Sequence, residues 1–378
     1  NTKPIDKLPQ AQVAVQTGNR NSGSTALPKL SAQEITRLLE QAPLALTGEL
    51  FDVQPSVTAP YSTGQVKSSA LQAALNRLNA MRRIAGLPSV ALDASLCQSA
   101  QYGAVVTAAN GGLNHYPTKP AGMDESFYKE GKSACSSSNL SAGSSLTGAV
   151  DAFMEDDGSN NVATVGHRRW QLNPSMGKVG FGYAESGTGY GRYVVEKVFD
   201  RSGGSVDYDF VAWPASGNFP GDLISRSVPW SISLNPKLYS TPSASDITVT
   251  VTRQSDGKTW TFRSGSADGI FYVSTTGMGE GPCIIFRPAS DSYTGSYTVS
   301  VQGLKAKNGQ SVADFTYQVD FFSLQGEEEQ EEKPETQQPD GQKPEDGSGS
   351  ASGQIFPGVP AGHWAGGAKR PAGGGGGV

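Results

Sequence analysis

The chain has 378 residues, of which 36% are hydrophobic and 17% charged, and this length predicts two globular regions with additional polar segments. Its formal net charge of −5 is concentrated near the C-terminus, where residues 327–346 contain nine acids and two lysines, a local net of −7. The remainder carries a net of +2 without a long basic run, which excludes the electrostatic footprint of nucleic-acid binding.

Three cysteines, Cys97, Cys135 and Cys283, are too few for a disulfide scaffold and rule out a four-cysteine zinc site. Cys97 and Cys135 fall in one predicted domain and could pair. We favour the interpretation that all three cysteines are small buried residues. No apolar run approaches the roughly 20 residues that span a bilayer, so no transmembrane segment is expected. The chain begins with Asn1 instead of Met, as expected after removal of a secretory signal or after trimming.

The first 65 residues predict one short helix in an otherwise irregular stretch. Residues 1 to about 30 are polar and without period, and we expect a flexible leader. Ser31 and Glu34 have the spacing of a capping box, and the apolar residues after them predict a short helix. Residues 44–64 contain two prolines and are expected to be extended.

Three amphipathic helices are predicted next. The first has apolar residues at spacings of four and three from Leu71 onward, and Gly86 ends it. Asp93 caps the second helix, which ends at Asn110. The third spans Leu146–Glu155, where the apolar residues form one stripe.

Strand-like runs follow these helices. Residues 178–183 and 192–199, joined by a glycine-rich turn, predict a hairpin sheet surrounded by the helices, an α/β layered unit. From about Trp230, short runs of β-branched and aromatic residues alternate with turns such as residues 307–309. Six or seven strands within about 95 residues are typical of an immunoglobulin-like sandwich.

Candidate chemistry centres on histidine, because only three are present. His115 follows the second helix, His167 follows the third, and His363 lies near the C-terminus. His115 and His167 could converge on a metal, although the residues alone favour each bonding within its own turn. The oxygen-rich loop 156–161 lacks EF-hand spacing, and the arginine pair after His167 is expected to be solvated or salt-bridged. No nucleophile elbow, P-loop or HExxH motif occurs.

Several motifs occur together in the order found in one family. They are Asn79-x-x-Arg82-x-x-Ala85-Gly86-Leu87, Leu113-Asn114-His115, Phe153-x-x-Asp156, Gly166-His167-Arg168-Arg169-Trp170-Gln171 and Val179-Gly180-Phe181-Gly182. In their order and spacing, residues 69–201 resemble the CAP superfamily, which comprises cysteine-rich secretory, antigen 5 and pathogenesis-related-1 proteins and is also called SCP-like.

The resemblance implies an α-β-α sandwich with a groove that collects two histidines and two acids, a set that holds zinc in some members. By position, His115 and His167 are the two imidazoles and Asp156 is the second acid. Ser138 stands in place of the first acid, followed by Asn139, which the family retains. We therefore expect a ligand groove lined by these five residues. Zinc is the candidate cofactor, held weakly or not at all by His115, Asp156 and His167 because one carboxylate is missing.

A second resemblance lies near the C-terminus. Residues 356–365, FPGVPAGHWA, resemble the opening of an S-layer homology repeat, with Gly358 at the usual Asp position. The stretch then changes to glycines, so we expect a degenerate or truncated repeat. Because such repeats dock to cell-wall polymers, this implies a bacterial envelope protein.

These observations predict an α+β protein in five parts. The parts are a leader with a short helix (1–65), a CAP domain (66–225), an immunoglobulin-like β-sandwich (226–325), an acidic linker (326–354) and the S-layer-homology-like tail (355–378). We expect a secreted, extracellular or cell-wall associated module that binds a cell-envelope polymer, a host molecule or a lipid through its groove. The alternatives are a metal-assisted hydrolase of wall or host polymers and a structural adhesin; no catalytic residue is assigned.

Overall fold

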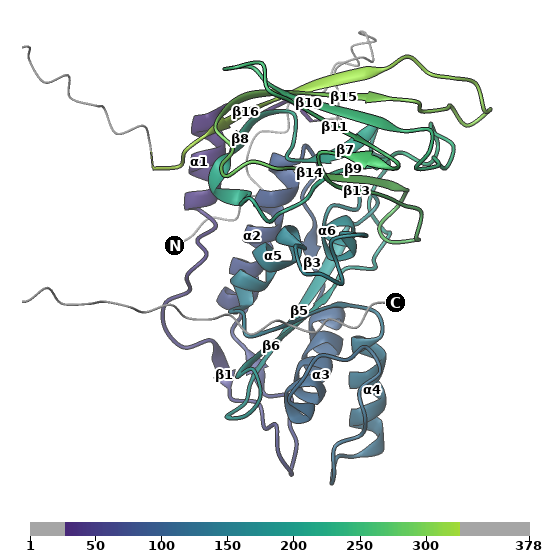
Figure 1. Ribbon diagram of the computed structural model, residues 1–378. Coiled ribbons are helices and arrows are strands. Elements are labelled where there is room, and N and C mark those ends of the chain that lie inside the picture. The colour runs from purple at the N-terminus through teal and green to yellow at the C-terminus, as the bar shows by residue number, and fades with distance from the viewer. Residues whose placement is uncertain (1–26, 326–378) are drawn as a thin grey trace, which may run out of the picture. The chain divides into compact units, whose positions relative to one another are not determined.

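The computed structural model describes residues 27–325 (Figure 1). Residues 1–26 of the predicted leader, the acidic linker and the S-layer-homology-like tail lie outside these residues. Helices and short strands alternate up to residue 197, and strands dominate after it. We call residues 68–197 the layered region and residues 210–322 the sheet region. Within the part of the chain described, no helix is long and apolar enough to cross a membrane.

Helices and strands are numbered along the chain. The helices are α1 (Ala32–Glu40), α2 (Ser68–Ile84), α3 (Ala94–Asn110), α4 (Glu125–Cys135), α5 (Leu146–Glu155) and α6 (Gly166–Gln171), with a 3-10 turn at Gly221–Leu223. The strands up to residue 197 are β1 (Phe51–Val53), β2 (Gln65–Val66), β3 (Ala91–Leu92), β4 (Asn139–Ala142), β5 (Lys178–Glu185) and β6 (Arg192–Lys197). The later strands are β7 (Phe210–Trp213), β8 (Gly217–Pro220), β9 (Trp230–Leu234), β10 (Thr248–Arg253), β11 (Thr259–Arg263), β12 (Ser266–Ala267), β13 (Gly269–Ser274), β14 (Cys283–Pro288), β15 (Gly295–Gln302) and β16 (Phe315–Phe322).

The predicted helix ends are confirmed by their caps. Ser31 Oγ accepts the Glu34 backbone N–H at 3.2 Å, and Glu34 Oε2 accepts the Ser31 N–H at 2.8 Å, which completes a capping box on α1. Asp93 Oδ1 accepts two backbone N–H groups at the start of α3, at 3.0 and 3.1 Å. Gly86, just past α2, has φ +76°, the left-handed conformation that ends helices with glycine.

A four-stranded sheet of order β3-β5-β6-β4 forms the middle of the layered region. β5 and β6 pair antiparallel, which confirms the predicted hairpin, and β3 runs parallel to β5. Helices α3 and α4 pack on one face of this sheet, and α2 and α5 lie on the other (Figure 1). The predicted α/β layering is therefore confirmed for this region.

Alternate side chains of β5 and β6 enter two different cores, as the period of a strand requires. Phe181 joins the core shared with α2 and α5, whereas Tyr193 joins the core shared with α3. Gly182 faces α3 so closely that a Cβ on it would lie 2.2 Å from the Ala100 carbonyl oxygen. The G-x-G pattern of β5 is thus explained by close packing of a helix against the sheet.

Helices α4 and α6 were not predicted from the sequence pattern. On α4 the buried positions are the small residues Gly131, Ala134 and Cys135, which make no hydrophobic stripe. On α6 two of the buried side chains are Arg168 and Arg169. Periodicity of large apolar residues cannot reveal helices whose buried side is built from small or charged residues.

The three cysteines are free, as the favoured interpretation expects. Cys135 and Cys283 are buried, and Cys97 is partly buried. Burial raises the pKa of all three thiols, so they remain in the unreactive thiol form near neutrality.

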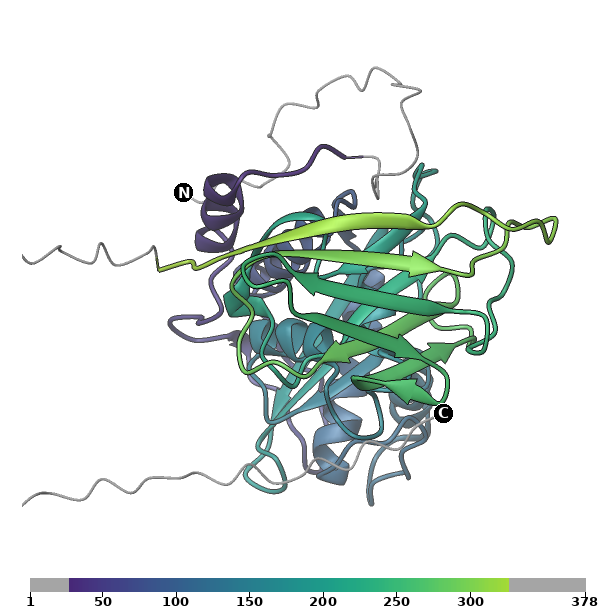
Figure 2. The same ribbon diagram turned by 45° about the horizontal axis from the view of Figure 1, so that its top comes forward.

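The sheet region contains two sheets, seen from above in Figure 2. One has six strands in the order β12-β11-β10-β15-β16-β8, and the other has four in the order β13-β14-β9-β7. Pairing is antiparallel in both sheets except between β16 and β8, which run parallel. Both sheets take a strand from before residue 226, since β7 and β8 belong to them. The predicted all-β character after the layered region is confirmed, and the immunoglobulin-like assignment stays a prediction.

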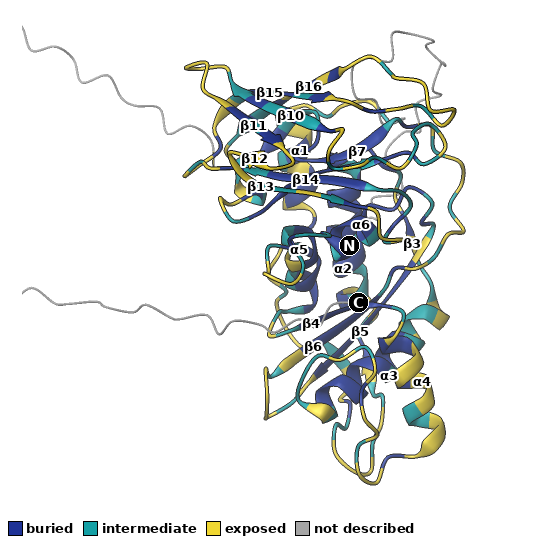
Figure 3. Ribbon diagram, turned by 45° about the vertical axis from the view of Figure 1, so that its right-hand side comes forward, coloured by how far each residue is buried: buried dark blue, intermediate teal, exposed yellow. Residues whose placement is uncertain are grey.

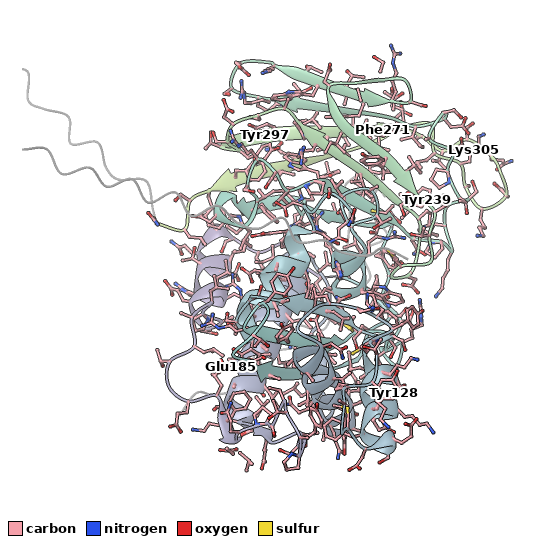
Figure 4. The ribbon with its side chains drawn as sticks, turned by 60° about the horizontal axis from the view of Figure 1, so that its bottom comes forward. Tyr128, Glu185, Tyr239, Phe271, Tyr297 and Lys305 are labelled. Carbon is pink, nitrogen blue, oxygen red and sulfur yellow. The ribbon has the colours of Figure 1, made fainter. Side chains whose placement is uncertain are left out.

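Aromatic side chains fill the space inside the sheet region. The Trp230 ring lies 5.2 Å from Tyr293, 5.7 Å from Phe321 and 5.9 Å from Tyr297 between ring centroids. All four are buried; Trp230, Tyr297 and Phe321 lie on β9, β15 and β16, and Tyr293 lies in the loop before β15. Tyr297 is labelled in Figure 4. Burying such rings supplies much of the hydrophobic stabilisation of a sandwich core.

Candidate functional site

The end of α5 and the start of α6 contain two residues with unusual backbone angles. Asp156 follows α5 with φ +47°, and Val165 precedes α6 with φ +42°. Among residues 27–325 these are the only residues other than glycine with positive φ. The conformation is tolerated by Asp but rare for a β-branched residue such as Val. Such strain is found most often at functional sites, which draws attention to the side chains held between these two positions.

Asp156 and His167 form the centre of this segment. His167 Nδ1 donates to Asp156 Oδ1 at 2.8 Å, and the Arg168 backbone N–H donates to Asp156 Oδ2 at 3.2 Å. The Phe153 ring stacks on the imidazole with 5.2 Å between centroids. The Asp156 side chain is 0% exposed, whereas the His167 side chain is 25% exposed. A buried carboxylate thus orients a histidine whose ring reaches the surface.

This pairing changes the acidity of His167. Burial alone would lower the pKa of the imidazole, but the charge of Asp156 and its hydrogen bond outweigh burial, so the pKa of His167 is raised. The ring of His167 therefore stays protonated, and positively charged, up to a higher pH than the ring of a free histidine.

Glu196 on β6 is a site residue that the sequence reasoning missed. Its Oε2 accepts from Asn139 Nδ2 at 3.0 Å, and its two oxygens accept from Gln171 Nε2 at 2.9 and 3.1 Å. Glu196 is 0% exposed, and burial raises its pKa to about 7 against the opposing effect of these hydrogen bonds and of His167. The sequence did contain one signal for this residue, a single acid within an apolar strand. Because a buried acid without a partner is costly, such an acid indicates a polar partner nearby.

Ser138 and Asn139 lie at the start of β4 and are each 2% exposed. Ser138 Oγ donates to the Ala134 carbonyl at 2.6 Å. Asn139 Nδ2 also approaches the His167 carbonyl oxygen at 3.3 Å, so Asn139 connects Glu196 to α6. Neither side chain offers a ligand appreciable surface, and a role for these two residues in a groove stays a prediction.

His115 lies on the loop after α3, and its Nδ1 donates to the carbonyl oxygen of Cys135, the last residue of α4, at 2.7 Å. The two histidines therefore contact opposite ends of one short segment, His115 at Cys135 and His167 at Asn139. The expectation that each histidine bonds within its own turn is wrong, because each bonds to a residue of a different element.

The residues proposed for zinc do not form a three-ligand set. Within residues 27–325 no group of three or more His, Cys, Asp or Glu side chains is placed to hold a metal. Both oxygens of Asp156 are occupied, one by His167 and one by the Arg168 N–H, so this carboxylate supports the histidine and is not directed at a shared ion with His115. Two imidazoles alone fall short of the three protein ligands of a catalytic zinc site.

Three clefts in the described residues lie away from these side chains. One is lined by residues around Lys29 and Arg83, one by residues around Arg226 and Arg287, and one by the β5–β6 turn near Glu185, which Figure 4 labels. His115, Asp156 and His167 line none of these three. The groove expected from the family resemblance at these residues therefore stays a prediction.

Arg168 connects α6 to α5 and to the sheet region. Its Nε donates to the Met154 carbonyl at 2.6 Å, and its Nη1 donates to the Pro229 carbonyl at 2.7 Å and to Ser231 Oγ at 3.0 Å. The side chain is fully buried, and burial lowers its pKa to about 10. The expectation of a solvated or salt-bridged arginine is wrong here, because backbone carbonyls serve as the acceptors.

Arg169 makes similar contacts on the other side of α6. Its Nη1 donates to Ser274 Oγ at 3.0 Å, and its Nη2 donates to the carbonyls of Thr276 and Gly281 at 2.8 and 2.7 Å. These acceptors lie at the end of β13 and in the loop before β14. The helix that carries His167 is thus held in place by the sheet region as well as by α5.

The N-x-x-R motif of α2 also has a structural role. Asn79 exchanges two hydrogen bonds with the Val90 backbone, at 2.8 and 3.0 Å. The buried Arg82 donates to the carbonyls of Pro88, Gln171 and Asn173 at 2.8–3.0 Å, and burial lowers its pKa to about 9. Arg82 therefore fixes the end of α6 to α2.

Comparison with known proteins identifies this region. Residues 75–198 match the family model described as CAP, the cysteine-rich secretory protein family, whose members are typically secreted. A search of curated proteins finds no match. The matched stretch runs from α2 to the residue after β6 and contains His115, Asp156, His167 and Glu196. Residues 75–198 of this chain are therefore a CAP domain, and the resemblance seen in the sequence is confirmed for this stretch.

Proposed function

We propose that this protein is a secreted or cell-surface CAP-domain protein that binds a ligand or partner at the surface around His167. The observation that carries the proposal is a partly exposed histidine held by a fully buried carboxylate, 2.8 Å away. Burying a carboxylate is unfavourable, and a neutral group could fill the same space at lower cost. A perturbed, oriented imidazole at the surface is the arrangement that recognition or proton exchange uses.

The chemistry of this surface favours a partner with an acceptor or a negative charge. The pKa of His167 is raised by Asp156, so its ring carries positive charge over more of the range near neutral pH. The buried Phe153 ring stacks on the imidazole and limits how the ring can turn. A cell-envelope polymer, a host molecule and a lipid headgroup each offer such groups, and binding measurements with defined probes separate them.

Metal-assisted hydrolysis receives less support as a function. It would need a metal held by His115, Asp156 and His167, and both Asp156 oxygens are already bonded to α6. Glu196 has a pKa near that of a general base, about 7, but is 0% exposed and cannot reach a substrate in this arrangement.

The test uses the full chain and the variants His167→Ala and His167→Asn, with Tyr190→Ala as a matched control. Tyr190 is an exposed aromatic residue in the β5–β6 turn of the same domain. Cosedimentation with isolated peptidoglycan and with vesicles of phosphatidylcholine or phosphatidylglycerol gives the affinity for each probe.

We expect the unmodified chain to bind at least one probe. Each His167 variant should weaken this binding about tenfold, because one charge-assisted hydrogen bond is lost. Tyr190→Ala should leave the affinity unchanged. Binding that persists unchanged in both His167 variants would contradict the proposal and would favour an adhesin that acts through its sheets.

A further inference from the structure

The cleft around Arg226 and Arg287 has a volume of about 850 Å³ and lies in the sheet region. Its walls come from the loop before β9, from the facing ends of β10 and β11, and from β13, β14 and the loop that follows β14. Figure 3 shows β10 and β11 on one side and β13 and β14 on the other, so both sheets contribute. This volume is within the usual range of small-ligand sites.

The cleft is lined by four cationic residues and one acidic residue. The cations are Arg226, Arg253, Lys258 and Arg287, and the acid is Asp291. The four cations come from three separate segments of chain, because Arg253 and Lys258 lie on the same β10–β11 hairpin. Only the folded sheets bring these three segments together. This explains why no basic run marks the site in the sequence.

Two of these cations are held over a buried indole. The Arg253 guanidinium lies 5.6 Å and the Lys258 ammonium 4.8 Å from the Trp260 ring centroid. Trp260 is 3% exposed, and its Nε1 donates to the Ala289 carbonyl at 3.2 Å. A fixed ring below the two side chains restricts their motion and reduces the entropy lost when they bind a ligand.

The positive charge of the cleft is only partly balanced. Arg253 forms an ion pair with Asp256. Arg226 lies 3.8 Å from Asp291, whose side chain is fully exposed, so this pair is weak.

The other two cations have no acidic partner in the part of the chain described here. Lys258 contacts the Trp260 ring, and neither Lys258 nor Arg287 has a carboxylate within 4.0 Å among residues 27–325. Arg287 Nη1 donates to the Ser227 carbonyl at 2.6 Å, which orients the guanidinium without neutralising it. Like charges held together in this way repel one another unless an anion lies between them.

We propose that this cleft is a second binding site, which takes a multiply charged anionic group, a phosphate or a carboxylate cluster, on the sheet region. Arginine matches both groups because its planar guanidinium donates two parallel hydrogen bonds to their oxygens. The two cations without an acidic partner, Lys258 and Arg287, supply the attraction, and Arg226 lies at the same cleft. This site is separate from the His167 surface and does not depend on it.

Isothermal titration of the full chain with inorganic pyrophosphate and with citrate, at low salt, tests the proposal. The variants are Arg287→Gln and Lys258→Gln, with Arg263→Gln as control. Arg263 is an exposed arginine at the other end of β11 and does not line the cleft. Lys258→Gln changes a side chain that lies over the face of Trp260 and forms no ion pair within residues 27–325. This variant keeps the test valid if Arg287→Gln disturbs the fold.

We expect saturable binding of at least one probe, weakened about tenfold by each cleft variant and unchanged by Arg263→Gln. Tighter binding of pyrophosphate identifies a phosphate ligand, and tighter binding of citrate identifies a carboxylate ligand. The proposal is overturned if neither probe binds at millimolar concentration, or if Arg263→Gln weakens binding as much as Arg287→Gln does, since a diffuse surface field would then explain the result.

Discussion

The Asp156 carboxylate lies 2.8 Å from the His167 imidazole, and the acid is fully buried while the histidine is partly exposed. Asp156 has a left-handed backbone conformation, and its side chain accepts hydrogen bonds from two residues of α6. The fold therefore tolerates both a strained backbone at Asp156 and the burial of its charge, and the result is an oriented His167 ring.

Replacing Asp156 by Asn removes the charge and keeps the shape. We expect the pKa of His167 to fall, because the attraction that outweighs burial is lost. An NMR titration of the imidazole measures it. Asp157→Asn is the control, since Asp157 bonds to Ser227 Oγ instead of to the ring. An unchanged His167 pKa in Asp156→Asn would show that the carboxylate does not set it.

Glu196 makes the stability of the fold depend on pH. Its pKa is about 7 in the folded chain and 4.5 ordinarily, so over this interval the folded state holds a proton that the unfolded state has released. Stability therefore falls as pH rises from about 4.5 to 7, by about 3 kcal/mol at most. The raised pKa of His167 acts in the same direction, since its stabilising charge is lost as pH rises through that pKa.

Glu196→Gln should remove most of this decline, because a neutral amide replaces the titrating acid. Urea unfolding at pH 5 and pH 8 measures the difference, with Glu130→Gln, an exposed residue of α4, as the control. The assignment of the decline to Glu196 fails if the Gln variant loses as much stability between these pH values as the unmodified chain.

Arg168→Ala should destabilise the whole described unit. The substitution leaves the Pro229 carbonyl, Ser231 Oγ and the Met154 carbonyl without this buried donor, at a cost of about 3–5 kcal/mol. Arg168→Lys should recover little, since one ammonium group cannot reproduce the guanidinium fork. Denaturant unfolding gives the loss, with the exposed Arg192→Ala for comparison. A loss below about 1 kcal/mol, the level of a surface pair, would mean that Arg168 does not hold the two regions together.

Gly182→Ala tests the close packing of β5 on α3. The added methyl group would lie 2.2 Å from the Ala100 carbonyl oxygen, so the helix must move, and we expect a cost of about 1–3 kcal/mol. Gly187→Ala is the matched control, because an added Cβ at that turn position meets nothing within 4 Å. Equal melting temperatures for the two variants would contradict this account of the G-x-G pattern.

Helices with conventional buried stripes could be predicted from the sequence. The α5 bounds agree with the prediction at both ends, and the caps at Ser31 and Asp93 are where their residue types indicate. Helix α6 could not be predicted in this way, because its buried arginines satisfy their charge with carbonyls from the loop before β9 and from the β13–β14 loop. Those acceptors are distant in sequence, and only the folded chain brings them near.

The site was predicted in part for a similar reason. The spacing of the family motifs placed Asp156 and His167 in one segment, and the two residues do pair. Glu196 was missed because its partners depend on register: Asn139 of β4 lies opposite Glu196 of β6 in the sheet. Strand register between segments about 57 residues apart cannot be read from local pattern.

The hydrogen bonds of Arg168 and Arg169 have a consequence for where this protein can be divided. A fragment cut at Val198, where the match to the CAP family ends, would keep both guanidinium groups and lose their acceptors on Pro229, Ser274 and Gly281. The helix that presents His167 would then border solvent on a side built to be covered. In folding terms the sheet region covers this helix of the CAP domain, and we expect the two regions to unfold together.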